Sequence, residues 1–149
     1  MLERPERVAA TLQEALVDLV GLGMVAKQGH WHVRGPQFLP VHQQLDAIVE
    51  DARAWADLVA ERSVALGVPV DARPSTVATE AGLPEFPTGW LADDKVVALM
   101  ADCIESVIVR MRSHVDELGE ADLVTQDLVI EILRGLEKHL WLLQAQHAV

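Results

Sequence analysis

The chain has 149 residues, which is enough for one domain with a substantial apolar core, and half of these residues are hydrophobic. A formal net charge of −11 makes nucleic acid a poor expected partner, because phosphate binding depends on Lys and Arg, and it favours a protein that handles cations. The single cysteine, Cys103, is expected to be a buried thiol. No apolar run approaches the roughly 20 residues that span a membrane, and no signal peptide is recognisable. We therefore expect a cytoplasmic protein.

Apolar residues recur at helical spacing through the first half of the chain and predict two long helices. The first spans about residues 5–33 and the second about residues 37–66. The dipeptide Gly35-Pro36 between them predicts a tight corner, because proline lacks a backbone N–H and restricts the residue before it. Gly67 is a favourable residue for ending the second helix.

The second half of the chain predicts two more helices after a long connection. They span about residues 91–118 and about residues 121–147. The proline-rich connection, residues 68–89, holds a short helix that we expect Ser75 to cap and Gly82 to end. Such a crossover lets the second and third long helices run parallel, so the sequence predicts an all-α four-helix bundle with a short extra helix in the crossover.

His30 and His42 lie at equal distances from the predicted corner, one six residues before Pro36 and the other six residues after it. If the helices fold back as an antiparallel hairpin, the two imidazoles lie opposite each other. A histidine at a helix edge is most often a hydrogen-bonded structural residue, and His32 is interpreted in that way, the alternative being an additional ligand. His30 and His42 differ, because the hairpin would place two good metal ligands together.

The second helix carries three carboxylates on the same stripe as His42. At roughly 100° per residue they fall within roughly 100° of that histidine, beside the apolar face of the helix. They are Asp46, Asp57 and Glu61. The last two would repel each other on a bare surface, and bound metal would relieve the repulsion. The alternative is a solvated acidic edge neutralised by Arg53 and Arg62.

Axial distance keeps these side chains from meeting at one ion within one chain. About 16 Å separates Asp46 from Asp57 along a helix, and about 28 Å separates His42 from Glu61, whereas metal–ligand bonds are about 2 Å long. Both pairs share one midpoint, between residues 51 and 52. Antiparallel pairing of two copies about that midpoint brings each residue to its counterpart in the partner, at two identical sites of an isologous interface. The mixed imidazole and carboxylate set suits Fe²⁺, Zn²⁺ or Mn²⁺.

These residues and their spacing resemble the Dps family of mini-ferritins. The resemblance is carried by His30-Trp31, Val33, Gly35, His42, Asp46, Asp57, Glu61-Arg62 and the run Leu-Glu-Lys-His-Leu-Trp at residues 136–141. It extends through the whole chain and implies a single ferritin-like domain over residues 1–149 without an extended basic tail. In that family the equivalent set is a ferroxidase centre shared between subunits, which corresponds here to His30, His42, Asp46, Asp57 and Glu61.

The same resemblance implies an activity and an assembly. Mini-ferritins oxidise Fe(II), preferentially with hydrogen peroxide, and store the ferric product in a hollow homododecamer, which protects the cell against oxidative stress. Two irons at one site would pass two electrons to one peroxide molecule and yield water, with Asp46 expected to bridge them. Iron is therefore the expected metal, with zinc or manganese as alternative occupants, and the cytoplasm or the nucleoid is the expected location.

The resemblance also implies roles for residues outside this set. Trp31 and Trp141 are expected to act as redox-active aromatics near the iron site, the alternative being ordinary interface or core residues. Asp122 and Asp127, near the start of the last helix, are expected to line a pore through which iron enters, the alternative being a solvated acidic face. Lys27, one turn before His30, would either orient a carboxylate or water or be solvated.

Three other functions remain open. A DNA-compacting shell with little ferroxidase activity would need basic tails, but Arg4 and Arg7 in the first seven residues are offset by Glu3 and Glu6. A di-iron enzyme with its centre inside one bundle needs Glu-x-x-His motifs on facing helices, and none of the six histidines has Glu three residues before it. A shell whose sites hold zinc or stay empty would have a structural role.

Overall fold

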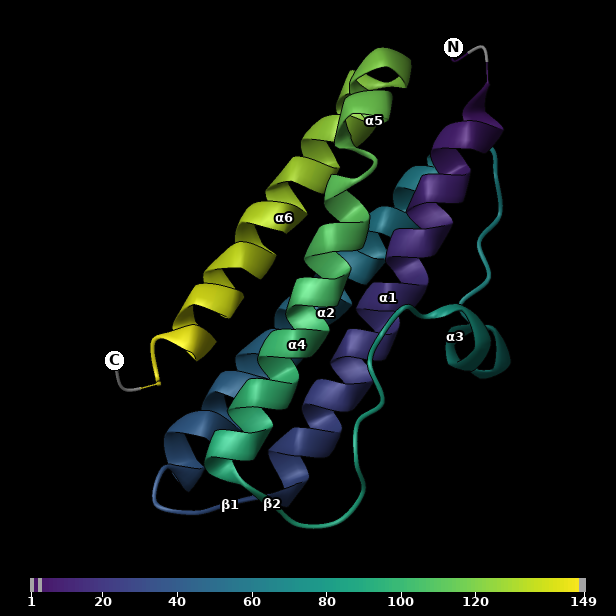
Figure 1. The fold of residues 1–149 in the computed structure, drawn as a ribbon. Helices are drawn as coiled ribbons and strands as arrows, with labels where there is room; N and C mark the ends of the chain where they lie inside the picture. The colour runs from purple at the N-terminus through teal and green to yellow at the C-terminus, as the bar shows by residue number, and fades with distance from the viewer. Residues whose placement is uncertain (1, 3, 148–149) are drawn as a thin grey trace.

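Four long helices form a bundle in the computed structural model, which describes residue 2 and residues 4–147. These helices are α1 (Pro5–His32), α2 (Phe38–Ala65), α4 (Asp93–Arg112) and α6 (Leu123–Gln144). Two short helices, α3 (Pro74–Glu80) and α5 (Val115–Ala121), lie between them along the chain (Figure 1). The predicted all-α four-helix bundle with a short helix in the crossover is confirmed.

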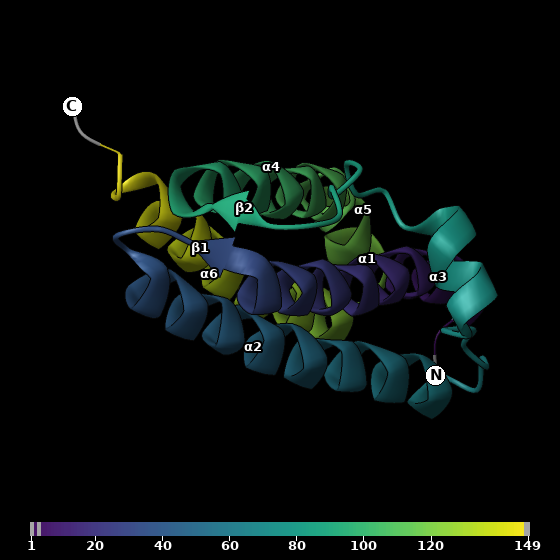
Figure 2. The same cartoon turned by 90° about the horizontal axis from the view of Figure 1, so that it is seen from below.

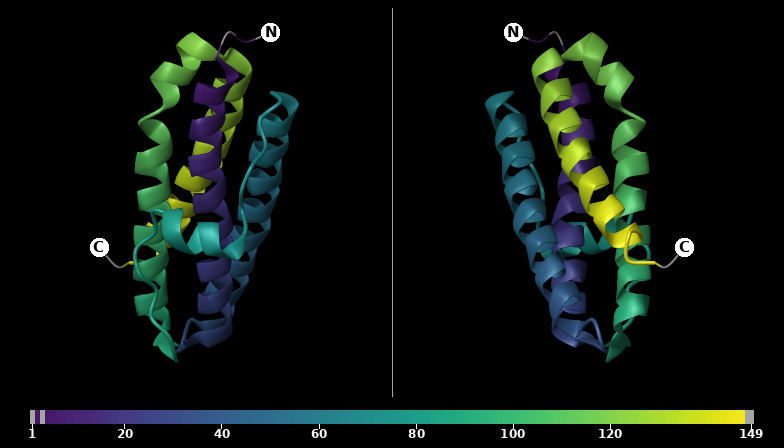
Figure 3. Two further views of the ribbon diagram at one scale, coloured as in Figure 1. Left: turned by 90° about the vertical axis from the view of Figure 1, so that its right-hand side faces the viewer. Right: turned by 90° about the vertical axis from the view of Figure 1, so that its left-hand side faces the viewer.

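The bundle consists of two antiparallel hairpins, α1 with α2 and α4 with α6. Seen from below, α2 and α4 lie on opposite sides with α1 and α6 between them, and the side views agree (Figures 2 and 3). Because α2 and α4 run in the same direction, upward in Figure 1, the segment between them must return along the bundle, as the sequence predicted. The core is built from apolar side chains at helical spacing; its fully buried members include Leu12, Leu19, Leu22, Leu45, Ile48, Met100, Ile104, Ile132 and Leu136.

The corner between α1 and α2 is tied to the start of α4. Val33–Arg34 (β1) and Leu91–Ala92 (β2) form a parallel pair of two-residue strands, which the sequence did not predict. Gly35 has a φ of +135°, and a Cβ at this position would lie 2.6 Å from a carboxylate oxygen of Asp93. That carboxylate accepts the backbone N–H of Gln37 at 2.7 Å. Only glycine fits this corner, which sets the register of the hairpin.

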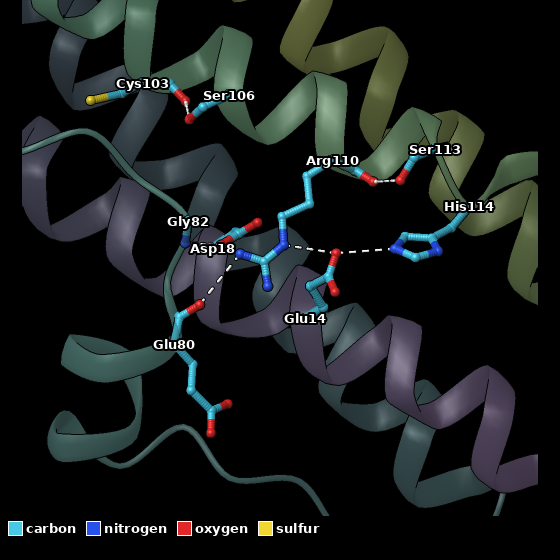
Figure 4. Close-up of polar contacts among 9 residues, drawn as sticks. All are labelled: Glu14, Asp18, Glu80, Gly82, Cys103, Ser106, Arg110, Ser113 and His114. Carbon is cyan, nitrogen blue, oxygen red and sulfur yellow. Dashed lines mark hydrogen bonds and ion pairs between the residues drawn. The ribbon is translucent and has the colours of Figure 1, made fainter.

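The crossover is anchored to α1 by a cluster of charged residues (Figure 4). Asp18 is 1% exposed and accepts the backbone N–H of Gly82 at 2.8 Å. Arg110 of α4 lies 2.7 Å from Glu14 and 3.4 Å from Asp18, and His114 approaches the same Glu14 carboxylate at 3.0 Å. These contacts hold the segment after α3 against the bundle. The sequence signal was Asp18 itself, a charged residue within an apolar helix stripe.

Several predicted boundaries were wrong. The third long helix ends at Arg112 and a separate helix, α5, follows. At this end the backbone N–H of His114 donates to the Met111 carbonyl, the Ser113 hydroxyl donates to the Arg110 carbonyl, and the His114 side chain turns toward α1. The last helix begins at Leu123 and ends at Gln144, inside the predicted range of 121–147.

The predicted cap of the short crossover helix was also wrong. Pro74 is the first residue of α3, Arg73 is its N-cap residue, and no side chain caps it. Proline suits this position because its missing N–H would have no partner in the first turn anyway. The helix ends at Glu80, so Gly82 lies beyond its end. At the end of α2, by contrast, Gly67 has a φ of +84°, as expected for the residue that ends a helix.

The expectation that no segment is apolar enough to span a membrane needs revision for α1. By length and composition this helix passes such a test, but 61% of its most apolar window is buried inside the bundle. Packing against the other helices therefore accounts for its apolar character. Cys103 on α4 is 1% exposed, which confirms the predicted buried thiol.

Candidate metal site

The hairpin corner places His30 and His42 face to face. Their ring centroids are 3.6 Å apart and their planes differ by 17°. His30 Nδ1 lies 2.7 Å from the carbonyl oxygen of His42, and His42 Nδ1 lies 2.7 Å from the carbonyl oxygen of His30. The predicted juxtaposition of the two imidazoles is therefore present.

These reciprocal hydrogen bonds determine which ring nitrogens are free. A carbonyl oxygen can only accept, so each Nδ1 must carry the proton and donate it. In the neutral ring the lone pair then lies on Nε2, the atom that can bind a metal. A metal-ligating histidine typically donates its other ring N–H in this way, because the bond fixes both tautomer and orientation. His30 is 7% exposed, which further restricts the motion of its ring.

Asp46 lies beside the histidine pair and is held by Lys27. One carboxylate oxygen is 2.5 Å from Lys27 Nζ and 3.6 Å from His30 Nδ1. The hydrogen bond from Lys27 lowers the pKa of Asp46, and the nearby His30 acts in the same direction. Of the two roles left open for Lys27, the structure shows that it orients a carboxylate. In doing so it occupies an oxygen that a metal would need.

Asp57 and Glu61 lie farther along α2, and both are exposed; at the rise of an α-helix, Asp57 lies about 16 Å and Glu61 about 22 Å beyond Asp46. Neither forms an ion pair with a described residue, and Arg62 pairs with Asp122 instead. The interpretation of this stretch as an acidic edge neutralised by Arg53 and Arg62 is thus not supported. Among residues 2 and 4–147 of one chain, no three His, Cys, Asp or Glu side chains are arranged to hold a metal. A full ligand set would need a second copy.

The two tryptophans are both on the surface. Trp31 is 60% exposed and follows His30 directly, and Trp141 on α6 is 61% exposed. Neither is a core residue of one chain, which leaves an interface role or the predicted redox role. His32 is engaged locally: its Nδ1 lies 2.8 Å from the Gln28 carbonyl oxygen, and its ring centroid is 5.5 Å from that of Trp90.

The two aspartates assigned to an iron pore differ in their surroundings. Asp122 is the N-cap residue of α6, where its side chain accepts the backbone N–H groups of Val124 and Thr125. It also pairs with Arg62 of α2 at 2.6 Å and is 9% exposed. Asp127 is exposed on α6. The pore prediction concerns an assembled shell and stays a prediction, but within one chain the Asp122 carboxylate has a structural role that the sequence reasoning missed.

Comparisons with known proteins agree with this architecture. A family model described as "Ferritin-like domain" matches residues 9–148. The chain is 34% identical to the DNA protection during starvation protein of Agrobacterium fabrum, covering 93% of this chain and 86% of that protein. It is 33% identical to DNA protection during starvation protein 2 of Deinococcus radiodurans, but the match spans 90% of this chain and only 56% of that protein.

A solved structure, Dps from Microbacterium arborescens in the high iron form, superposes with a TM-score of 0.92. Its sequence is 36% identical, and the match covers 96% of this chain and 93% of that one. The fold of the present chain is therefore similar to that of an iron-containing relative over almost its full length. The similarity includes the helices that carry the histidine pair.

Proposed function

This chain belongs to the Dps family of ferritin-like proteins, and on that premise we propose that it is a mini-ferritin: a cytoplasmic ferroxidase that oxidises Fe(II), preferentially with hydrogen peroxide, and stores the ferric product in a hollow homododecamer. The observation that carries the proposal is the histidine pair. Both Nδ1 atoms are tied to backbone carbonyls, so two neighbouring Nε2 atoms are available for a metal.

The donor set fits iron as a substrate. His30, His42 and Asp46 form one half of the proposed site, and Asp57 and Glu61 from a second copy form the other half. Imidazole and carboxylate together suit Fe²⁺, and also Zn²⁺ or Mn²⁺, which are alternative occupants. The net charge of −11 per chain attracts such cations.

The reaction consumes two Fe(II) ions and one peroxide. Two electrons pass from the two ferrous ions to one H₂O₂, its O–O bond breaks, and two protons complete two water molecules. No hydroxyl radical is released, and the product is two ferric ions for storage. Within this scheme the protein's residues bind and orient the metal, and we propose that Asp46 bridges the two ions and that Trp31 or Trp141 absorbs stray oxidising equivalents.

DNA protection is part of the names of the Agrobacterium and Deinococcus relatives. For this chain we propose protection through removal of iron and peroxide, because a strongly acidic protein binds phosphates poorly. A DNA-compacting shell with little ferroxidase activity remains the alternative. A gel shift that persists at moderate salt would favour that alternative.

Subunit mixing tests whether the site is shared. H42A and E61A each damage every site in a homo-oligomer, so both variants are expected to lose rapid Fe(II) oxidation. In a mixed pair one site carries both defects and the other carries neither. Random reassembly of equal amounts should therefore restore about a quarter of the sites.

The control is a mixture of H42A with D46A, whose defects lie in the same half of the site. No mixed pair of these two variants contains an intact site, so activity should stay low. Recovery only in the first mixture supports a site shared between subunits. Equal activity in both mixtures, or none in either, would contradict it.

A further inference from the structure

Two more pairs of exposed residues on α2 share the midpoint of the proposed ligand pairs. Glu50 and Arg53 lie next to that midpoint and carry opposite charges, and Leu39 and Val64 lie near the two ends of the helix. Leu39 is 55% exposed and Val64 is 60% exposed, although both are large apolar residues. Neither Glu50 nor Arg53 forms an ion pair with any residue in the described part of the chain.

We propose that Glu50 of one subunit pairs with Arg53 of the partner subunit, and Arg53 with the partner's Glu50, and that these reciprocal ion pairs set the register in which the two halves of the iron site meet. Contacts between Leu39 and the partner's Val64 close the ends of the same face. This inference rests on the proposed function, because it names the residues that position its shared site.

The placement of these residues fits a second copy of the chain as the partner. At roughly 100° per residue, Glu50 and Arg53 lie roughly 60° apart, on either side of the direction of Asp46. Residues of opposite charge lie at equal distances on either side of the midpoint of this helix face. An antiparallel second copy therefore places each residue opposite its counterpart and forms each pair twice. A different protein would have to place matching residues at the same spacing for all four pairs, namely the two ligand pairs, the charged pair and the apolar pair.

The surroundings of Arg53 support its part in the interface. A Cβ added at Gly23 of α1 would lie 3.9 Å from Arg53 Cγ, so the stem of the arginine lies beside α1, while the residue as a whole is exposed. Beside it an open groove between α1 and α2 is lined by Val20, Met24 and Asp57. Met24 is 59% exposed and gives the face further apolar area for a partner to cover.

The charges also disfavour a shift of the register in one direction. If the partner helix moved by one turn, about 5.4 Å, in one direction, Glu50 would face the partner's Asp57 and Asp46 would face the partner's Glu61. Both contacts join like charges, and like charges across an interface are unfavourable. In the proposed register the same acids face an arginine or a shared metal. The charges therefore oppose a shift in this direction away from the register in which the iron site is complete.

Charge-swap variants test the inference in metal-free buffer, where iron chemistry plays no part. E50R and R53E each set two pairs of like charges against each other and should raise the concentration of half-dissociation, measured by native mass spectrometry, about tenfold or more. The double variant E50R/R53E recreates both pairs with the wild-type net charge and should assemble like the wild type. It is the matched control, because it contains both substitutions.

An effect of net charge alone is distinguishable. E50R makes the chain less acidic and R53E makes it more acidic, so such an effect would shift assembly in opposite directions. An equimolar mixture of the two single variants should form mixed pairs in preference to like pairs, because each mixed pair sets arginines against glutamates. Every iron-site ligand is unchanged in such a pair.

The outcomes separate the inference from the proposed function. Unchanged assembly of either single variant, or a double variant that folds by circular dichroism but assembles no better than the single variants, would overturn the inference. If assembly follows the charge pattern while the wild type does not oxidise Fe(II), the pairing stands and the proposed function fails. If the double variant also restores the rate of iron oxidation lost in the single variants, Glu50 and Arg53 are positioning residues for the site.

Discussion

Replacing Asp122 with alanine is expected to destabilise the junction between α2 and α6. The carboxylate caps α6 through Val124 and Thr125, and loss of an N-cap typically costs about 1 kcal/mol. The change also leaves Arg62, whose side chain is 24% exposed, without its ion-pair partner and with only the hydrogen bond to Thr125 Oγ1, which costs about 1–3 kcal/mol. The two losses together lower the free energy of unfolding by about 2–4 kcal/mol. Because that free energy falls by about 2 kcal/mol per M of urea, the urea midpoint of unfolding should fall by about 1–2 M.

The assay is urea denaturation followed by circular dichroism at one fixed protein concentration, because assembly contributes to the apparent stability. D127A is the matched control: it removes an exposed aspartate from the same helix and should leave the midpoint unchanged. Equal midpoints for D122A and the wild type would refute the capping role.

The pH dependence of the same variant provides a second check. Burial raises the pKa of Asp122, but hydrogen bonds from Thr125 and Arg62 outweigh it and hold the pKa below the ordinary value of 3.8. A carboxyl group with a lowered pKa stabilises the folded state fully above about pH 4 and loses that contribution as the pH falls through its folded-state pKa. The difference in the free energy of unfolding between the wild type and D122A should therefore be at its full size at pH 7 and become smaller in acid. A constant difference would contradict the ionised cap.

Two further predictions concern Lys27 and Cys103. Lys27 holds the Asp46 oxygen that a metal needs, so K27M should bind Zn²⁺ up to about fivefold more tightly by titration calorimetry, and weaker binding would show that the lysine helps to build the site. Burial raises the pKa of the Cys103 thiol to about 11, so it should not react with a thiol reagent at pH 8 until urea unfolds the protein, and rapid labelling of the native protein would contradict its burial.

The hairpin and its histidine pair were predictable because they depend on local signals. The Gly35-Pro36 corner fixes where the chain turns, and equal spacing from the corner then brings His30 and His42 together. The parallel course of α2 and α4 followed from the length of the crossover. In each case the relevant distances are set by the helix itself, without knowledge of how the helices pack.

Features that depend on tertiary contacts were not predictable in the same way. The break between α4 and α5 involves His114, which turns toward Glu14, a residue 100 positions earlier in the chain. Asp122 was assigned to an iron pore from the family resemblance, and its capping role was missed because the start of the last helix was placed at residue 121, two residues too early. With the boundary at Leu123, the same aspartate is recognisable as an N-cap residue.

Anomalous scattering at the iron edge, from crystals soaked anaerobically with Fe(II), tests the shared site most directly. We expect an iron peak within bonding distance of His30 and His42 Nε2 of one subunit and of a carboxylate from Asp57 or Glu61 of its neighbour. Iron bound elsewhere, with these two acids facing solvent and far from any neighbouring imidazole, would contradict the account.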